Sequence, residues 1–466
     1  MIEQVDLVVI GAGPAGLEVA ITARSCGLSV TLIDEQPAPG GQIYRAVERN
    51  SGTSHLAALG ADYGTGANIV KRFRASGSGY WPDTTVWDIA REHNSSFVVT
   101  ASRAGRPRQM RARRIVIATG AQDRPMPIPG WTLPGVLTAG ALQIALKSGA
   151  GVPSGRLVLI GNGPLLWLVA SQLVAAGAPP TAILDTTPVN RIWQALPLLP
   201  GALQSAGQLL KGLRMIRAVK RAGVPIYRGV TDVAVRGLDK AQSVTCTRRG
   251  RNLEFATDLV GLHDGIVPSL HAALASGCAS VWDRAQQCFQ PEIDRWGDTS
   301  VPGLAVAGDG GGILGAEAAT LTGRLAGLQA AAKLGFVSDT ERDRQAAPAW
   351  RELALARALR RFLDRLYAPC FGVAAMHDSV VVCRCEEVSA GDIRIAVRLG
   401  ATGPAQVKAF TRCGMGPCQS RLCGTTLTAL IAQVRGCPVE TVGPPRLRFP
   451  LKPVTLAEMA TAETNS

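Results

Sequence analysis

The chain begins with a short apolar strand that leads directly into a glycine-rich turn and a helix. Residues 5–10 are rich in β-branched side chains, which is typical of a buried parallel strand, and residues 17–25 predict a helix. In a dinucleotide-binding turn, one glycine permits the bend, a second lets the backbone approach a pyrophosphate, and a third lets helix and strand pack closely. The helix start also offers free N–H groups to phosphates. The candidate cofactor-binding residues of this turn are Gly11, Gly13, Ala15 and Gly16.

A second predicted strand, residues 28–33, ends in an acidic pair, Asp34 and Glu35. Asp34 follows the glycine turn by about 20 residues, the spacing at which an acid binds ribose hydroxyls in such folds. This acid favours a nucleotide site over an ordinary glycine-rich turn in an α/β core. The proline- and glycine-rich loop that follows contains Gly41 and Gln42, and it lets the backbone run close to a ligand.

Two later strands also end in small or acidic residues. Residues 109–118 predict a strand that is followed by Thr119 and Gly120, and a buried strand near residue 305 is followed by Gly308 and Asp309. α/β sheets bind ligands at the carboxyl ends of their strands. Asp309 alone could be a helix N-cap. Together with the other glycine-marked strand ends, it is better interpreted as an acceptor for a polyol beside the dipole of the next helix, residues 316–334.

A second strand-turn-helix pattern begins at residue 157. Its turn has Gly161 and Gly163, but Leu166 stands at the third glycine position, where a bulky side chain should push the helix away or widen the turn. Asp185 ends the next predicted strand. The pattern predicts a second dinucleotide fold and leaves open whether NAD(P) or another nucleotide binds there. If one does, Asp185 favours a free ribose hydroxyl over a 2′-phosphate.

Composition excludes several classes of protein. The 466 residues suffice for two or three domains, and the net charge of +14 is scattered without any nucleic-acid-binding motif, so we expect no nucleic acid partner. An acidic protein partner remains an alternative. We expect no integral membrane segment and no signal peptide, hence a cytoplasmic protein. The five histidines are scattered, and we assign no catalytic residue: His55, His93, His263, His271 and His377.

Six of the eleven cysteines fall between residues 383 and 437. In a cytosolic chain, clustered cysteines indicate metal or redox chemistry rather than structural disulfides. A C-x-C pair at 383 and 385 and a C-x4-C pair at 418 and 423 offer four thiolates, which suit a [2Fe-2S] cluster or tetrahedral zinc. Flanking glycines favour the cluster, whose sulfurs need backbone N–H donors. Cys413 is left as a spare that could replace Cys418 or Cys423.

The segments VVIGAGPAG, PGGQ, IATGA and VAGDGGGILGAEAA, in this order, resemble flavoproteins of the pyridine-nucleotide oxidoreductase type over about residues 1–335. The resemblance implies an α/β protein with two Rossmann-like dinucleotide-binding domains, one inserted in the other. The FAD-binding domain would span 1–151 and 266–335, and an NAD(P)-binding-like domain 152–265. FAD would be held by Gly11, Gly13, Ala15, Gly16, Asp34, Glu35, Gly41, Gln42, Thr119, Gly120, Gly308 and Asp309. Cys26 and Cys246 stand alone, so we expect no dithiol chemistry.

The cysteine-rich segment resembles the small α-helical [2Fe-2S] domain of the bacterioferritin-associated-ferredoxin (BFD) type. The resemblance implies the ligands Cys383, Cys385, Cys418 and Cys423. A BFD-like domain would then span 376–450, after a helical linker at 336–375 and before a tail at 451–466.

The combination resembles the larger subunit of heteromeric bacterial dehydrogenases such as opine oxidases, D-hydroxyproline dehydrogenase and hydrogen cyanide synthase. It implies an electron-transfer subunit with FAD and a [2Fe-2S] cluster, working with a second FAD-dependent subunit that oxidises an amino-acid, imino-acid or opine substrate. A small ferredoxin-like subunit is a further expected partner. The alternatives are a stand-alone NAD(P)H-dependent FAD oxidoreductase and a scaffold whose cofactor sites have decayed. The intact motifs disfavour the scaffold, and Leu166 disfavours the reductase.

Overall fold

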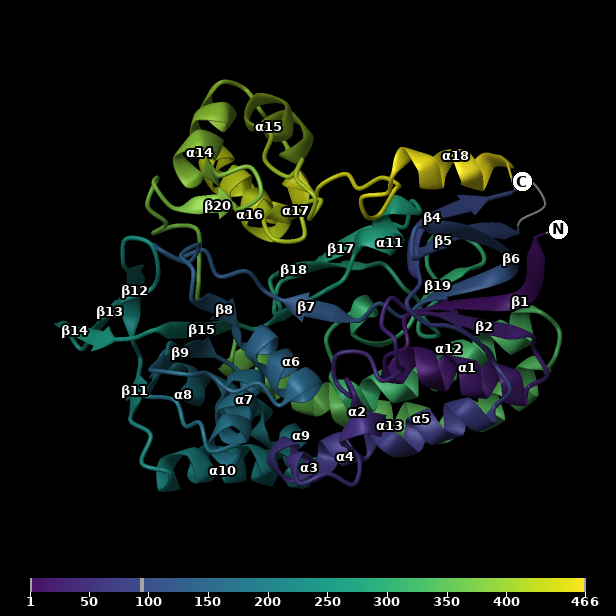
Figure 1. Cartoon of the computed structure of the whole chain (residues 1–466), viewed down its shortest axis with the longest axis horizontal. Helices are drawn as coiled ribbons and strands as arrows, with labels where there is room; N and C mark the ends of the chain where they lie inside the picture. The colour runs from purple at the N-terminus through teal and green to yellow at the C-terminus, as the bar shows by residue number, and fades with distance from the viewer. Residues whose placement is uncertain (1, 93–95, 465–466) are drawn as a thin grey trace.

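The computed structural model describes residues 2–92 and 96–464. The second of two α/β units is inserted in the first, a small helical domain comes after them, and the tail returns to the first unit (Figure 1). No helix in the described part of the chain has the length and apolar character needed to cross a membrane.

The first sheet has seven strands in the order β3-β2-β1-β6-β5-β4, with β19 paired to β6. The central strand β1 is parallel to β2 and β6, as predicted. β19 comes from far along the chain and pairs in parallel with β6, so this sheet is completed only by residues 304–306. The strands are β1 (Glu3–Ile10), β2 (Val30–Ile33), β3 (Gly79–Trp81), β4 (Thr85–Arg91), β5 (Phe97–Arg103), β6 (Arg106–Ile117) and β19 (Leu304–Val306).

One face of this sheet is covered by α1 (Pro14–Ser25), with α12 (Ala316–Lys333) and α5 (Gly66–Ala75) packed against it. A Cβ atom at Gly323 of α12 would lie 2.3 Å from the backbone oxygen of Ala15 in α1. The two helices therefore meet backbone to backbone. Three short helices add buried side chains to the same core: α2 (Val47–Asn50), α3 (His55–Leu59) and α4 (Ala61–Gly64).

The second sheet is parallel, in the order β11-β10-β9-β15-β8. Helices cover one face, and a three-stranded antiparallel sheet covers the other. The parallel strands are β8 (Val136–Thr138), β9 (Leu157–Asn162), β10 (Ala182–Asp185), β11 (Ile226–Arg228) and β15 (Leu259–Asp264), and the antiparallel strands are β12 (Thr231–Arg236), β13 (Ser243–Arg248) and β14 (Arg251–Ala256). The helices are α6 (Ala139–Gly149), α7 (Pro164–Ala175), α8 (Arg191–Ala195), α9 (Leu199–Leu203) and α10 (Ala206–Arg221).

The structure differs from expectation at the edge of this second unit. β8 lies within the segment expected in the first domain, yet it pairs with β15, because Val136 is buried in the same apolar core as Val158 and Val260. The two chain crossings between the units, β7 (Ala121–Asp123) and β16 (Ile266–Pro268), pair with each other as a short antiparallel ribbon.

Helix α13 (Asp339–Leu366) leads from the first unit toward the helical domain. That domain contains β20 (Val381–Cys383), β21 (Val388–Ser389), α14 (Ala390–Arg398), α15 (Pro404–Thr411), α16 (Gly424–Arg435) and α17 (Val439–Val442). The tail helix α18 (Leu456–Thr464) packs on β6 (Figure 1). Between the domains lie α11 (His271–Ala275), β17 (Ser280–Asp283) and β18 (Cys288–Pro291).

Candidate functional site

The glycine turn after β1 is closely packed at Gly11 and Gly16 and has open space at Gly13. A Cβ atom on Gly11 would lie 2.5 Å from the backbone oxygen of Ala118, and one on Gly16 would lie 1.9 Å from the backbone oxygen of Gly11. At Gly13, by contrast, no atom lies within 4 Å of a Cβ atom. Gly13 is also the N-cap of α1 and provides no side-chain cap. The turn therefore leaves free space before the uncapped N-terminus of α1, which fits a pyrophosphate.

Asp34 closes this turn from the next strand. Its carboxylate accepts hydrogen bonds from the backbone N–H of Ala12 at 2.5 Å and of Gln36 at 2.7 Å. Burial raises the pKa of Asp34, and the two backbone hydrogen bonds oppose that rise. A carboxylate has about four acceptor positions, so two remain for ribose hydroxyls. Glu35 is different, because it forms an ion pair with Lys452 of the tail.

The proline- and glycine-rich loop lies on the same turn. The N–H of Gly40 donates to the backbone oxygen of Ala12 at 2.8 Å, and a Cβ atom on Gly41 would lie 2.7 Å from the Cα of Gly13. The loop therefore needs glycine for close contact with the turn, as the sequence indicated. The backbone oxygen of Gln42, the next residue, accepts a hydrogen bond from Lys147.

The two later strand ends meet at the same edge of the first sheet. Asp309 is buried, and its Oδ1 accepts hydrogen bonds from the backbone N–H groups of Leu314 and Gly315, both at 2.9 Å. Burial raises its pKa, and these hydrogen bonds oppose the rise. A carboxylate that accepts both bonds through one oxygen keeps the second oxygen as an acceptor, which suits a polyol hydroxyl.

The remaining predicted residues are packing partners within this edge. A Cβ atom on Gly308 would lie 2.7 Å from the Cβ of Ala15, so these two residues bring α1 and the strand end together. Thr119 donates to the backbone oxygen of Ser269 at 3.4 Å, and the N–H of Ser269 donates to Gly120 at 2.9 Å. The structure thus brings the predicted set to one edge, while each residue's contact with FAD stays a prediction.

Lys147 is a residue of this region that sequence reasoning missed. Its side chain is buried, and its Nζ donates to the backbone oxygen of Gln42 at 3.0 Å and to Oε1 of Gln143 at 2.9 Å. Burial, helped by nearby Arg45, lowers the pKa of Lys147 to about 7. A lysine in an amphipathic helix carries no sequence signal of this kind, because the Gln42 backbone that it contacts lies far away along the chain.

The Lys147 ammonium gives a prediction about stability and pH. Between about pH 7 and the ordinary lysine value of 10.5, the unfolded chain keeps the proton that the folded chain releases, so this group makes stability rise with pH. Lys147→Met should abolish this contribution to the increase of stability with pH. Urea unfolding midpoints at pH 7, 8 and 9 measure it, with Lys211→Met, an exposed lysine paired to Asp62, as the control. Equal slopes in wild type and Lys147→Met would contradict the assignment.

The cysteines of the helical domain gather in two adjoining groups. The sulfurs of Cys383, Cys413 and Cys423 all lie within 4.8 Å of one another. Hydrogen bonds from the thiols of Cys413 and Cys423 lower the pKa of Cys383, and the N–H of Gly414 points to its sulfur at 3.5 Å. A buried thiolate that receives a backbone N–H fits the donor set of an iron-sulfur cluster.

The second group is the pair Cys385 and Cys418. Burial raises the pKa of Cys385, which also forms hydrogen bonds with the backbone and the side chain of Cys418. A Cβ atom on Gly416 would lie 2.3 Å from the Cβ of Cys385, so only glycine allows this approach. The four predicted ligands are thus divided between the two groups, and Cys413 lies with Cys383 and Cys423.

The loop that carries Cys418 is held against the first α/β unit. Nε2 of Gln122 in β7 donates to the backbone oxygen of Arg421 at 2.7 Å. Nε2 of His271 in α11 is 2.7 Å from the backbone oxygen of Gln419. Burial, followed by the charge of Arg421, lowers the pKa of His271 to about 4, so the ring is neutral and donates to this carbonyl. β7 directly follows Gly120, so the loop lies beside the candidate flavin edge.

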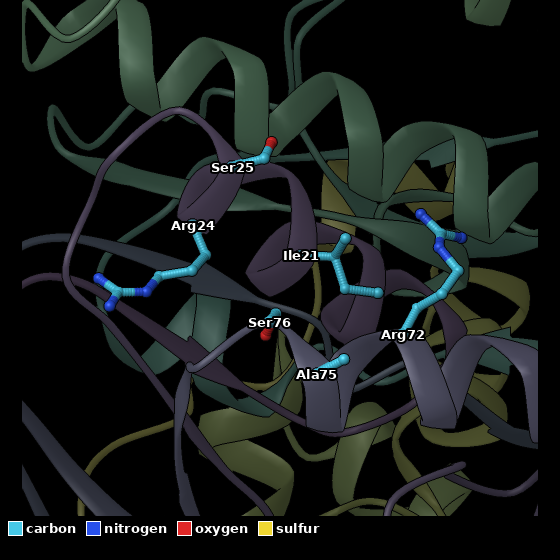
Figure 2. A pocket seen from close by; sticks show the side chains of 6 residues that line it. All are labelled: Ile21, Arg24, Ser25, Arg72, Ala75 and Ser76. Carbon is cyan, nitrogen blue, oxygen red and sulfur yellow. The ribbon is translucent and has the colours of Figure 1, made fainter.

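The other described histidines make their contacts outside the cysteine loop, and His263 lies beside β7. His55 contacts the backbone oxygen of Leu146, His263 lies 3.4 Å from Asp123, and His377 contacts Ser379. His93 lies outside the described residues. A surface hollow between α1 and α5 has two arginines on its wall, but Arg24 and Arg72 point to opposite sides (Figure 2). The hollow therefore has no convergent charge for an anion.

A family model described as pyridine nucleotide-disulphide oxidoreductase matches residues 5–331. The chain belongs to this family. A second model, described as a BFD-like [2Fe-2S] binding domain, matches residues 381–433. Together with the glycine turn and the cysteine groups, these matches identify an FAD-dependent oxidoreductase with a [2Fe-2S] cluster. All eleven cysteines of this oxidoreductase are free in the structure.

Three known proteins show how far the likeness extends. A subunit of opine oxidase from Agrobacterium tumefaciens is 43% identical over 98% of this chain and 91% of its own length. Hydrogen cyanide synthase subunit HcnB of Pseudomonas aeruginosa is 31% identical over 96% of each chain. The crystal structure of L-proline dehydrogenase from P. horikoshii has the same fold, with a TM-score of 0.71 over 98% of this chain and 80% of that chain at 21% identity.

The open space at Gly13 gives a prediction about cofactor content. Gly13→Leu should fold, because no atom stands within 4 Å of the new Cβ, yet the side chain would fill the pyrophosphate position. We expect the purified variant to lack FAD. Absorbance of the released flavin per chain measures this, and Gly207→Leu in α10, which also has open space around it, is the control. Stoichiometric FAD in Gly13→Leu would show that the pyrophosphate lies elsewhere.

Proposed function

We propose that this chain is the electron-transfer subunit of a heteromeric dehydrogenase that oxidises an amino-acid, imino-acid or opine substrate. In this proposal the substrate is oxidised on a second FAD-dependent subunit. The names of the relatives support it, because the opine oxidase chain and HcnB are each one subunit of a larger enzyme. A small ferredoxin-like subunit is a further proposed partner, and the free cysteines favour a cytoplasmic location.

One observation carries the proposal: the cysteine loop is docked on the candidate flavin edge. Gln122 and His271 hold the backbone of residues 419–421, one position beyond Cys418. When bound, FAD takes up electron pairs and a [2Fe-2S] cluster passes single electrons. The residues of this chain would hold the two groups close together. His271 is already engaged by a carbonyl, and the buried His263 faces Asp123 of β7, so we assign substrate chemistry to a partner.

The proposed residues follow from this arrangement. FAD would be held by the glycine turn, by Asp34 and by Asp309, with Gly41, Gln42, Thr119 and Gly120 along its path. The cluster would be held by Cys383, Cys385, Cys418 and Cys423, with the buried Cys413 thiol beside them.

A serine series tests the cluster ligands. Serine at Cys383, Cys385, Cys418 or Cys423 should destroy or strongly perturb the cluster, because losing one thiolate leaves an open, oxidisable iron. Serine at Cys413 or Cys437 should leave it intact, and FAD should remain in every variant because a separate domain binds it. Iron and acid-labile sulfide analysis with electron paramagnetic resonance decides the matter. Loss of the cluster in Cys413→Ser with retention in Cys423→Ser would reverse the assignment, and stoichiometric zinc without sulfide would refute a cluster.

The hydrogen bond between His271 and the backbone of Gln419 gives a prediction about the rate of electron transfer within the chain. His271→Leu removes the hydrogen bond to the backbone oxygen of Gln419 and should slow electron transfer from flavin to cluster by tenfold or more. Rapid freeze-quench after photoreduction of the flavin measures cluster reduction. His377→Leu, a surface histidine of the helical domain, is the matched control and should behave like wild type. An unchanged rate in His271→Leu would show that this hydrogen bond does not contribute to electron transfer from flavin to cluster.

The partner subunit is tested with the chain expressed in its native host. We expect a tagged chain to co-purify with a second flavin-containing chain in fixed stoichiometry. Opines, D-hydroxyproline or L-proline should bleach the flavin of the complex anaerobically and leave the isolated chain unchanged. Bleaching of the isolated chain by one of these substrates would place the substrate site on this chain.

A further inference from the structure

The second α/β unit keeps the local geometry of a nucleotide site. Its strand-end acid, Asp185, accepts the backbone N–H of Thr187 at 2.9 Å, in the same way as Asp34 accepts Gln36 in the first unit. Leu166 at the third glycine position neither blocks nor unfolds the turn, because its side chain is fully buried in the apolar core beneath α7. The carboxyl edge of this parallel sheet is therefore where a dinucleotide would be expected.

That edge is filled by the chain itself. Residues 367–371 leave α13 and cross the ends of β9 and β15. Asn162, in the glycine turn, donates through Nδ2 to the sulfur of Cys370 at 2.8 Å and to the backbone oxygen of Ala368 at 3.2 Å. Asp264, at the end of β15, accepts the backbone N–H of Cys370 at 2.9 Å and of Phe371 at 3.3 Å. Two strand ends thus bind one short peptide.

Two further contacts seat this peptide. The guanidinium of Arg191 donates to the backbone oxygens of Ala368 and Pro369. Tyr367 forms a hydrogen bond with Trp167 of α7 and lies near Asp185, and burial together with the charge of Asp185 raises its pKa to about 12. The tyrosine thus lies at the acid that would bind a ribose.

We propose that the second dinucleotide cleft takes residues 367–371 of the same chain in place of NAD(P)H. The seated peptide closes the cleft to pyridine nucleotides and fixes the chain between α13 and the [2Fe-2S] domain. Its donors and acceptors are the groups that a nucleotide would need: the glycine-turn side chain, the strand-end carboxylates and a guanidinium. This inference concerns the middle domain alone, so it stands or falls separately from the proposed partner.

Hydrogen exchange on the holoprotein tests whether the peptide is seated. The amides of Cys370 and Phe371 should be protected, and Asp264→Asn should speed their exchange at least tenfold by weakening both acceptors. Asp258→Asn is the matched control. Asp258 is an exposed aspartate that forms an ion pair with Arg156 and directly precedes β15, so its substitution should leave the exchange rates of these amides unchanged. Should Asp264→Asn fail to fold, Arg191→Ala removes two other contacts and should give the same result. Unprotected amides in wild type, or unchanged exchange in a folded variant, would overturn the proposal.

Nucleotide binding tests whether the cleft is closed. Isothermal titration of the wild-type holoprotein with NADH, and separately with NADPH, should show no binding up to 1 mM, and neither nucleotide should bleach the flavin in anaerobic stopped flow. Saturable binding of either nucleotide would overturn the proposal, whether or not the 370–371 amides stay protected. That result would favour a stand-alone reductase only if flavin reduction accompanied it, whereas binding without reduction would leave the electron-transfer proposal intact.

Discussion

The architecture depends on direct contact between backbones at the N-terminal end of α1. Gly16 lets α1 approach the glycine turn, Gly323 lets α12 approach Ala15, and Gly41 lets the following loop lie on Gly13. Each contact is possible only without a side chain. The consequence is a helix end that is closely surrounded but uncapped, with its N–H groups free for an anion. The strand-end acids Asp34 and Asp309 then frame that end from two sides of the sheet.

Side chains from outside the helical domain form hydrogen bonds with its backbone oxygens. Gln122 and His271 donate to the backbone oxygens of Arg421 and Gln419. Trp131 donates to the backbone oxygen of Val381 at 2.6 Å. On the far side the tail returns to the first sheet, where the N–H of Leu451 donates to Trp87 at 2.8 Å. Both flanks of the cysteine loop are therefore anchored, which restricts the distance between the two cofactor sites.

Sequence patterns predicted the features that depend on local chemistry. The glycine turn, the strand-end acids and the helices 17–25 and 316–334 all occur where the residues indicated. The cysteine pairs are arranged differently, because Cys383 lies with Cys413 and Cys423 while Cys385 lies with Cys418. The position of Lys147, the pairing of β8 with β15 and the seating of residues 367–371 arise from contacts between distant segments. No periodicity or spacing encodes such contacts, so only the folded structure reveals them.

The position of β19 late in the sequence affects the order in which the two sheets can fold during synthesis. During synthesis, the second parallel sheet emerges complete once β15 has left the ribosome, since all its strands lie between residues 136 and 264. The first sheet must wait for residues 304–306 and for the helix after them, although its opening strand is translated first. Domains generally fold as units when their last element becomes available. The nascent chain would therefore carry an unfinished apolar sheet through most of its elongation, with the middle domain already folded beside it.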